Sequence, residues 1–340
     1  MTVASSRKKS PICNTENSLF FSLVDYRNNY FTSDYPKRII EFYNGFENRD
    51  QLIQWMRERP KGVANIHEVD GDKEIIVVIP TADFNGKYAM ECRENIFKGL
   101  HMVFVESGEV PDPYFNYAHN CNVGISKAMD YNPKWVVVSN DDMYKIDDIK
   151  KLRYQLHSVP NDADVAYAIS PEHRFGVRCY LGTPTFFYLF INLFRRRFRL
   201  LNKVKKSILP KIEIVSEFYT GVGIVKKIAK LLLIRPIKNS QEFLHISSFG
   251  IFSNGFIRDM NGSLYDETYV NNSEDIDLSY RISFKKANIY EIKYKIGDLV
   301  SSSLGKGEDQ FLRGIAGIVY FCENWEQFLA NKPPFVSKVT

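Results

Sequence analysis

The chain has 340 residues, of which 44% are hydrophobic and 25% are charged. This composition is ordinary for a soluble globular protein with one large or two smaller domains, and it argues against intrinsic disorder. The five cysteines are odd in number, scattered and without a CxxC pair, which disfavours a disulfide framework or a zinc site and favours a reducing cytoplasm. The sequence shows neither a signal peptide nor a run of ~20 apolar residues, so neither secretion nor a transmembrane span is expected.

The net charge of +5 is unevenly distributed along the chain. Residues 174–240 contain 15 Lys and Arg residues against only Glu213 and Glu217, a local excess of +13 that leaves the rest of the chain near −8. Such asymmetry indicates a surface that meets an anionic partner, such as phospholipid, nucleic acid or a phosphorylated carrier.

The first 70 residues are polar and aromatic and predict an N-terminal helical extension. Helical patterns cover Tyr35–Phe46 and Asp50–Arg59. The main domain is expected to span residues 71–325, interrupted by residues 174–240 as a basic amphipathic insertion.

The next elements indicate a parallel α/β sheet. Glu74–Thr81 predicts a buried strand, Tyr88–Lys98 a helix and His101–Val105 a second strand. A strand, a helix and a strand in succession form a parallel βαβ unit. The further predicted elements are a helix near Asn116–Asp130, a strand at Trp135–Ser139 and a strand at Asp164–Ile169.

The basic segment predicts two amphipathic helices. At roughly 100° per residue, Thr185–Leu209 gathers Phe and Leu side chains on one face and most of its Arg and Lys on the other, and Gly223–Ile234 repeats the pattern. Such helices suit an anionic membrane surface, which residues 185–235 would contact. The alternative is a pair of helices that pack on the sheet with solvated Lys and Arg faces. Nucleic-acid binding is not expected.

Asn140, Asp141 and Asp142 directly follow the apolar strand Trp135–Ser139, so their side chains are expected at its C-terminal end. In open α/β sheets, ligands bind at that edge. Two adjacent carboxylates in a cleft repel each other unless a hard cation such as Mg²⁺ or Mn²⁺ lies between them and a bound phosphate. The pattern therefore indicates a site for a divalent ion and a nucleotide diphosphate. The alternative is an ordinary turn or helix cap.

A second acidic cluster, Glu274, Asp275 and Asp277, stands about 130 residues further on and is followed by Arg281. Its carboxylates could serve a reaction as a proton acceptor. The structural alternative is the acidic first turn of a helix that complements the helix dipole, with Arg281 as the i+4 partner of Asp277. Both interpretations can hold together.

Five motifs in a fixed order carry a family resemblance. In chain order they are Val77–Thr81, Asn120-x-Asn122-x-Gly124-x-x-x-Ala128, Val138–Asp142, Gly262–Glu267 and Glu274-Asp275-x-Asp277-Leu278-x-x-Arg281. The series resembles family 2 of the inverting, nucleotide-sugar-dependent glycosyltransferases. The resemblance implies the GT-A fold, an α/β fold whose mixed, mostly parallel sheet is flanked by helices. It also implies transfer of a sugar from a nucleotide-diphosphate sugar to a hydroxyl of a glycan or lipid-linked glycan.

The resemblance further implies roles for individual residues. Asp142 would bind the Mg²⁺ or Mn²⁺ that bridges the donor diphosphate, and Asp141 would contact the ribose or the water shell of the metal. Asp275 would be the general base that deprotonates the acceptor hydroxyl. Glu274 and Arg281 would orient Asp275 or contact the acceptor. The remaining assignments are Thr81, Glu106, Asn122 and Asn140 to the donor nucleotide, and Asp277 and Lys306 to the acceptor side.

Two positions depart from the family pattern. Cys121 precedes Asn122 where the family often has Arg, and residues 282–320 contain no His where many members have one that contacts the metal. Lys306 lies in about that region and could instead neutralise phosphate. A third metal ligand is therefore not assigned, and the histidines of this chain, including His245, are assigned to packing or to the surface.

The resemblance and the basic segment together predict a cytoplasmic enzyme, peripheral at the inner face of the cell membrane, with a lipid-linked acceptor. A rival from another class is a non-catalytic GT-A-like module that binds anionic lipid or nucleic acid through the basic helices. A nucleotidyltransferase would also use strand-end carboxylates and Mg²⁺. It would need a glycine- and lysine-rich loop near the first strand, and Thr81–Lys87 supplies little of that.

Overall fold

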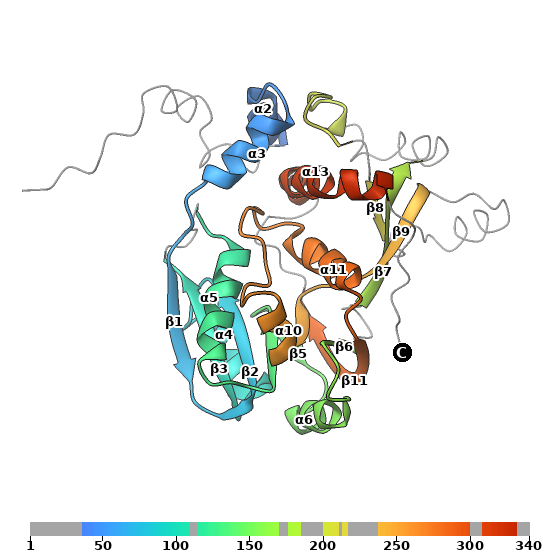
Figure 1. Cartoon of the computed structure of the whole chain (residues 1–340). Coiled ribbons are helices and arrows are strands. Elements are labelled where there is room, and N and C mark those ends of the chain that lie inside the picture. The colour runs from blue at the N-terminus through green and yellow to red at the C-terminus, as the bar shows by residue number, and fades with distance from the viewer. Residues whose placement is uncertain are drawn as a thin grey trace, which may run out of the picture.

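An eight-stranded sheet and a separate three-stranded sheet form the framework of the protein (Figure 1). The computed structural model describes residues 36–108, 114–169, 176–184, 200–210, 213–216, 237–299 and 308–331. Helices cover both faces of the larger sheet, and further helices pack beside it.

The larger sheet is mixed. In spatial order it consists of β1 (Ala64–Val69), β3 (Leu100–Ser107), β2 (Asp72–Thr81), β4 (Trp135–Ser139), β10 (Phe249–Ser253), β6 (Val165–Ile169), β11 (Ile289–Asp298) and β5 (Met143–Lys145). Strands β1, β10 and β5 run antiparallel to their neighbours, and the other strands share one direction. The predicted α/β class with a mixed sheet flanked by helices is confirmed and is compatible with a Rossmann-like fold.

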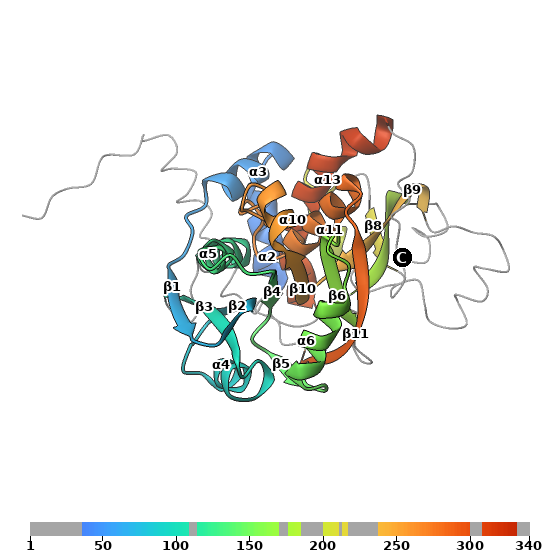
Figure 2. The same ribbon diagram turned by 60° about the horizontal axis from the view of Figure 1, so that its bottom comes forward.

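Strand β2 shows why the sheet carries a core on each face, because successive side chains of a strand point to opposite sides. Ile75, Val77 and Ile79 pack into one buried cluster, whereas Ile76 and Val78 pack into another. Figure 2 shows the two helical layers. The first cluster includes residues of α4 (Lys87–Glu91), of the π-helix Cys92–Ile96 and of α6 (Ile149–Ser158), and the second includes residues of α5 (Tyr117–Met129), α10 (Asn254–Asp259) and α11 (Glu274–Lys285).

Helix α5 lies unusually close to the sheet at Gly124. A Cβ atom at this position would be 2.4 Å from Cγ1 of Val78 and 2.9 Å from Cγ2 of Val105. The helix begins after Asn116, whose side chain accepts a hydrogen bond from the His119 N–H and so caps the helix. Its first turn is thereby fixed beside the C-terminal ends of the parallel strands.

The N-terminal helices belong to the folded domain. Helices α2 (Pro36–Gly45) and α3 (Arg49–Glu58) share a buried cluster with α12 (Glu308–Arg313) and α13 (Ile315–Asn331). Figure 1 shows α2, α3 and α13 at the same end of the molecule. The Tyr43 hydroxyl donates a hydrogen bond to the Leu312 carbonyl at 2.7 Å. Both helices were expected, but strand β1 was not. Because β1 is an edge strand of the larger sheet, the sheet begins before the predicted boundary at residue 71.

The basic segment 174–240 contributes strands, which the sequence analysis did not predict. β8 (Glu213–Ser216), β7 (Gly176–Pro184) and β9 (Ile237–Ile246) form a three-stranded antiparallel sheet in that order. Strand β9 leads directly into β10, so the end of this segment reaches the larger sheet.

The predicted helix Thr185–Leu209 lies within the described residues only from Leu200 onward, and residues 202–209 form turns and bends there. Val204 and Ile208 are nonetheless buried, in the cluster that contains α2. The Lys205 ammonium donates a hydrogen bond to the Phe46 carbonyl at 3.1 Å. In this part of the segment the apolar side chains are therefore covered by the protein itself. The second predicted helix, Gly223–Ile234, lies outside the described residues.

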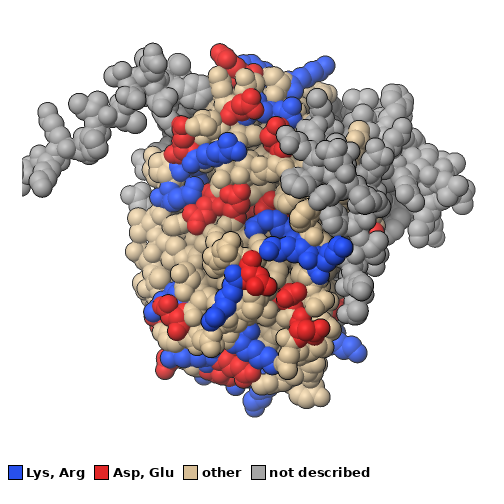
Figure 3. Space-filling view, viewed as in Figure 1, with Lys and Arg blue, Asp and Glu red and all other residues tan. Residues whose placement is uncertain are grey.

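The described surface carries both signs of charge. On the face shown in Figure 3, Lys and Arg are interspersed with Asp and Glu. Every helix within the described ranges is too short or too polar to cross a lipid bilayer. Most Lys and Arg residues of the segment 174–240 lie outside the described residues, so its contact with an anionic membrane stays a prediction.

We expect Gly124→Ala to lower the free energy of unfolding by about 1–2 kcal/mol, because the new methyl group would collide with Val78 and Val105. The gain in helix propensity, about 1 kcal/mol, offsets only part of this loss. Urea unfolding measures the difference. Gly255→Ala in α10 is the matched control, since its Cβ would come no closer than 4.0 Å to Oγ of Ser253. Equal stability of the two variants would contradict the close packing of α5.

Candidate functional site

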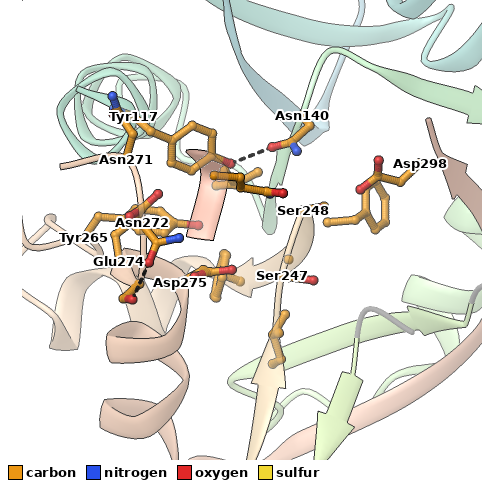
Figure 4. A pocket seen from close by; sticks show the side chains of 17 residues that line it. Tyr117, Asn140, Ser247, Ser248, Tyr265, Asn271, Asn272, Glu274, Asp275 and Asp298 are labelled. Carbon is orange, nitrogen blue, oxygen red and sulfur yellow. Dashed lines mark hydrogen bonds between the residues drawn. The ribbon is translucent and has the colours of Figure 1, made fainter. Parts of the chain in front are cut away.

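A cavity of about 280 Å³ lies at the edge of the larger sheet where the parallel strands end (Figure 4). Asn140 and Tyr117 line it from the end of β4 and the start of α5, and Glu274 and Asp275 line it from the start of α11. The segment Asn140–Asp142, through Asn140, and the second acidic cluster, through Glu274 and Asp275, therefore meet at one cavity although they are far apart in the sequence. The segments 246–250 and 271–273 and the residue Asp298 complete much of the wall.

The pairing of β4 with β10 positions Asn140. Ser139, the last residue of β4, stands opposite Phe249, the first residue of β10. The Asn140 N–H donates to the Ser248 carbonyl at 3.0 Å, and its side-chain Oδ1 accepts a hydrogen bond from the Tyr117 hydroxyl at 3.0 Å (Figure 4). The strand end, the first turn of α5 and the segment before β10 are thus joined at this residue.

The two aspartates that follow Asn140 do not line the cavity. Oδ2 of Asp141 accepts a hydrogen bond from the Thr81 hydroxyl at the end of β2, at 2.7 Å. Burial raises the pKa of Asp141 to about 6; the Thr81 hydrogen bond opposes this shift and the negative charge of Asp142 adds to it. Asp142 is itself buried, and its main-chain carbonyl accepts from the Leu299 N–H at 3.0 Å.

Asp298 is a carboxylate of the cavity that the sequence analysis did not single out. It ends β11 and stands opposite Met143, the residue after Asp142, in the antiparallel pair of β11 and β5. In Figure 4 it lies on the other side of Ser248 from Glu274 and Asp275. Only the pairing of β11 with the short edge strand β5 brings it here, so no local motif could have indicated it.

Glu274 and Asp275 begin α11 but have different surroundings. Oδ2 of Asp275 lies 2.9 Å from Nε2 of His245, and its Oδ1 accepts from the Ile276 N–H at 2.8 Å. Glu274 is only 6% exposed, and its Oε2 has no hydrogen-bond partner among the residues that the structure describes. His245, which the sequence analysis assigned to packing or the surface, is therefore the ion-pair partner of Asp275.

These surroundings separate the pKa values of the three groups. Burial raises the pKa of Glu274 to about 8, and the charge of Asp275 adds to the shift. Burial opposes ionisation of Asp275, but the charge and hydrogen bond of His245 outweigh it and hold the Asp275 pKa below its usual range. Burial likewise disfavours the charged form of His245, yet Asp275 raises the pKa of His245 to about 10. A His245–Asp275 pair that favours its charged form therefore stands beside Glu274, whose uncharged form is favoured by burial.

Asp277 and Arg281, expected on the acceptor side and beside the base, do not line the cavity. The Asp277 carboxylate accepts from Nε of Arg281 at 2.8 Å and from the indole N–H of Trp325 in α13 at 2.8 Å. The Arg281 guanidinium also donates to the Leu264 carbonyl. The i+4 pair is thus present, and it holds α11 to α13 and to the preceding loop. Burial raises the pKa of Asp277 despite the charge of Arg281.

Asn122 and Glu106 were both expected to contact the donor nucleotide. Each instead forms hydrogen bonds with the backbone of a loop. The Asn122 amide donates to the Tyr265 carbonyl at 2.8 Å and accepts from the Tyr265 N–H at 3.1 Å. The Glu106 carboxylate accepts from the Phe84 N–H at 2.8 Å and lies 2.9 Å from Nε2 of His67. The Phe84 hydrogen bond lowers the pKa of Glu106, although burial opposes it. Neither residue lines the cavity, and the predicted Lys306 lies outside the described residues.

The cavity wall is acidic. Glu274, Asp275 and Asp298 line it, together with hydroxyl and amide side chains, and no Lys, Arg or His is among the described residues of its lining. A phosphate group placed here would meet only negative and neutral side chains from the described part of the chain. A bound diphosphate would thus require a cation.

The chemistry of these donors fits a hard divalent ion. Across the described ranges, no three Asp, Glu, His or Cys side chains come together as a complete metal centre. Mg²⁺, however, is commonly held by one or two carboxylates together with the phosphates of a substrate. Asp141 and Asp142 supply two carboxylates at the strand end, which suits an ion that binds together with a phosphorylated ligand.

The backbone of residues 271–273 is held in place by α13. A Cβ atom at Gly317 would lie 2.2 Å from the Asn272 carbonyl oxygen. Asn271 and Ser273 both have left-handed backbone conformations, with φ of 53° and 72°. The Asn271 side chain accepts from the Tyr117 N–H at 2.8 Å, which joins the segment to α5. Close approach and backbone geometry together present Glu274 to the cavity.

We expect Gly317→Ala to displace the Asn272–Ser273 backbone and to lower the free energy of unfolding by roughly 1–3 kcal/mol. Gly314→Ala is the matched comparison, because its Cβ would meet only the flexible Asn272 amide, at 3.1 Å. Denaturant unfolding of the two variants should show the larger loss for Gly317→Ala. The reverse order would contradict a backbone contact between α13 and the cavity wall.

The raised pKa of Glu274 predicts a pH-dependent stability. Because the folded pKa, about 8, exceeds the ordinary value of 4.5, this residue reduces stability progressively as the pH rises from about 4.5 to about 8. Glu274→Gln cannot ionise, so its melting temperature should exceed that of the wild type at pH 8. Thermal melts of both proteins from pH 4.5 to 9 test this. A difference that does not grow with pH would rule out the buried, uncharged carboxyl group.

Comparisons with known proteins add no family assignment. No protein-family model matches the chain, and no curated protein matches its sequence significantly.

Proposed function

We propose that the protein is a metal-assisted glycosyltransferase of GT-A fold, which moves a sugar from a nucleotide-diphosphate sugar to a hydroxyl of a glycan or lipid-linked glycan. One observation carries the proposal. Asn140, at the end of a buried parallel strand, and the Glu274–Asp275 pair, at the start of a helix, line one cavity at the ligand-binding edge of an α/β sheet.

The donor diphosphate would bind over the ends of β2 and β4. Support for this placement comes from the contact between Thr81 and Asp141 and from the buried carboxylate of Asp142 beside them. These aspartates would hold Mg²⁺ or Mn²⁺ together with the donor phosphates. When bound, the ion supplies positive charge that stabilises the departing nucleotide diphosphate.

The acceptor would occupy the cavity itself. Its wall combines carboxylates with the hydroxyls of Ser247 and Ser248, the amide of Asn272 and the rings of Tyr117 and Tyr265. A few convergent polar groups beside aromatic rings are typical of a small-molecule site, and hydroxyls and amides match the donors and acceptors of a sugar. An uncharged, hydroxyl-rich acceptor suits this wall better than a phosphate group does.

A carboxylate at the start of α11 supplies the proton acceptor that the reaction needs. The acceptor hydroxyl loses its proton as its oxygen attacks the anomeric carbon, and the bond from that carbon to the diphosphate breaks. The family resemblance assigns the proton to Asp275. Both Asp275 and Glu274 line the cavity, so either could reach a bound hydroxyl.

Calorimetric titration with UDP, GDP and their sugars, with and without Mn²⁺, tests the donor site. We expect binding that requires the metal, is abolished by a chelator and weakens at least tenfold in Asp142→Ala. Loss of a group that only supports a metal ligand typically costs about 10–100-fold in metal affinity, so loss of the ligand itself should cost at least as much. Asp162→Ala, in an exposed turn before β6, is the matched control and should bind as the wild type does.

A folded wild-type protein that binds none of these nucleotides would contradict the proposal. That result would favour a non-catalytic module instead.

A further inference from the structure

The two carboxylates at the start of α11 differ in what already occupies their oxygens. Both oxygens of Asp275 are engaged, Oδ2 by His245 at 2.9 Å and Oδ1 by the Ile276 N–H at 2.8 Å. A carboxylate that accepts a charge-assisted hydrogen bond holds a proton weakly, because the interaction favours its ionised form. Asp275 is therefore a poor acceptor for a proton from a substrate.

Glu274 offers what Asp275 lacks. It lines the cavity and is only 6% exposed. Its Oε2 is buried and has no hydrogen-bond partner within the described residues. A buried carboxyl oxygen without a hydrogen bond is costly to maintain, so its presence beside a cavity points to a ligand group that pairs with it.

The groups that face Glu274 come from several elements. Tyr117 and Cys121 approach from α5 and Tyr265 from the preceding loop, and burial raises the pKa of each of them well above its usual range. These groups are therefore uncharged near neutral pH. Within the part of the chain that the structure describes, the charges that act on Glu274 are those of Asp275 on its own helix and His245 on β9.

We propose that Glu274 is the residue that takes the proton from the acceptor hydroxyl, and that the His245–Asp275 ion pair positions it and sets its electrostatic environment. The inference rests on the proposed glycosyl transfer. In the step, the hydroxyl proton moves to the Glu274 carboxylate while the hydroxyl oxygen forms its bond to the anomeric carbon. The bond from that carbon to the diphosphate breaks, and its electron pair leaves with the nucleotide diphosphate.

The assignment agrees with the requirements of general base catalysis. An effective base has a pKa near the working pH, so that it is ionised often enough and still binds the proton well. The pKa of Glu274, raised to about 8 by burial, meets this condition, whereas that of Asp275 is shifted in the opposite direction. The assignment also connects the small sheet to the site, because β9 carries His245.

The test measures release of nucleotide diphosphate from UDP-sugars and GDP-sugars with mono- and oligosaccharide acceptors between pH 6 and 10. The wild-type rate should rise with the ionisation of one group of pKa about 8. Glu274→Gln should lose about 100-fold or more of the rate, as removal of a general base does. Glu274→Asp, which keeps a carboxylate but shortens it, should retain part of the activity.

Two further variants distinguish a base from a positioning pair. Asp275→Asn removes a negative neighbour and should shift the rising limb of the pH profile to lower pH. His245→Gln removes a positive neighbour and should shift it to higher pH. Both should keep measurable activity. Glu41→Gln on the exposed face of α2 is the control and should match the wild type; the Glu41 carboxylate lies 3.7 Å from the Lys37 ammonium.

Near-normal activity of Glu274→Gln, or complete loss in folded Asp275→Asn, would overturn the assignment and return the role of base to Asp275. Circular dichroism melts establish that each variant is folded. Absence of nucleotide release by the wild type with every donor would overturn the proposed function and this assignment with it. In that case the pH-dependent stability gain of Glu274→Gln would still report its buried carboxyl group, so the two failures are distinguishable.

Discussion

The cavity depends on one constraint, the antiparallel placement of β10 between β4 and β6. Because β10 runs against its neighbours, it starts at the edge where the parallel strands end. The residues just before it, Ser247 and Ser248, therefore lie beside Asn140, and β9 delivers His245 to the same place. A parallel strand at this position would begin at the opposite edge of the sheet, and neither β9 nor its histidine would reach the strand-end residues.

Helix α11 serves the cavity and the core through different acidic residues of its first turn. Glu274 and Asp275 face the cavity, whereas Asp277 turns toward Arg281 and Trp325. Ser279, one turn after Asp275, accepts a hydrogen bond from the Ile246 N–H at 2.9 Å and so fixes the helix against the end of β9. Contacts of this kind hold a reactive side chain close to the position and orientation that catalysis requires.

The sequence predicted those parts of the fold that carry a local signal. Continuous β-branched runs identified β2 and β4, and the Asn-Asp-Asp cluster could be placed at a strand end because a parallel strand ends at a ligand-binding edge. Strand β1 has mostly exposed or half-buried side chains, so it shows no apolar run. The cavity residues contributed by β9, β10 and β11 depend on strand pairing between distant segments, which no local pattern records.

The roles of individual polar residues were less predictable, and the reason is chemical. Asn122, Asp277 and Arg281 have the side chains that a substrate site would use, but the same donors and acceptors close loops and join helices here. Residue type alone cannot separate these outcomes, since a hydrogen bond satisfies a buried polar group whichever partner supplies it. His245 was missed for the complementary reason, because its carboxylate partner lies on another element.

The short connection between β9 and β10 also couples the small sheet to the cavity. Only Ser247 and Ser248 separate the two strands, and Ser248 has a left-handed backbone conformation, with φ of 34°. A partner whose binding shifts β9 would therefore move the carbonyl that holds Asn140 and the imidazole that faces Asp275. Thermodynamic linkage makes such an effect reciprocal. A ligand in the cavity would change the affinity of the small sheet for that partner by the same factor.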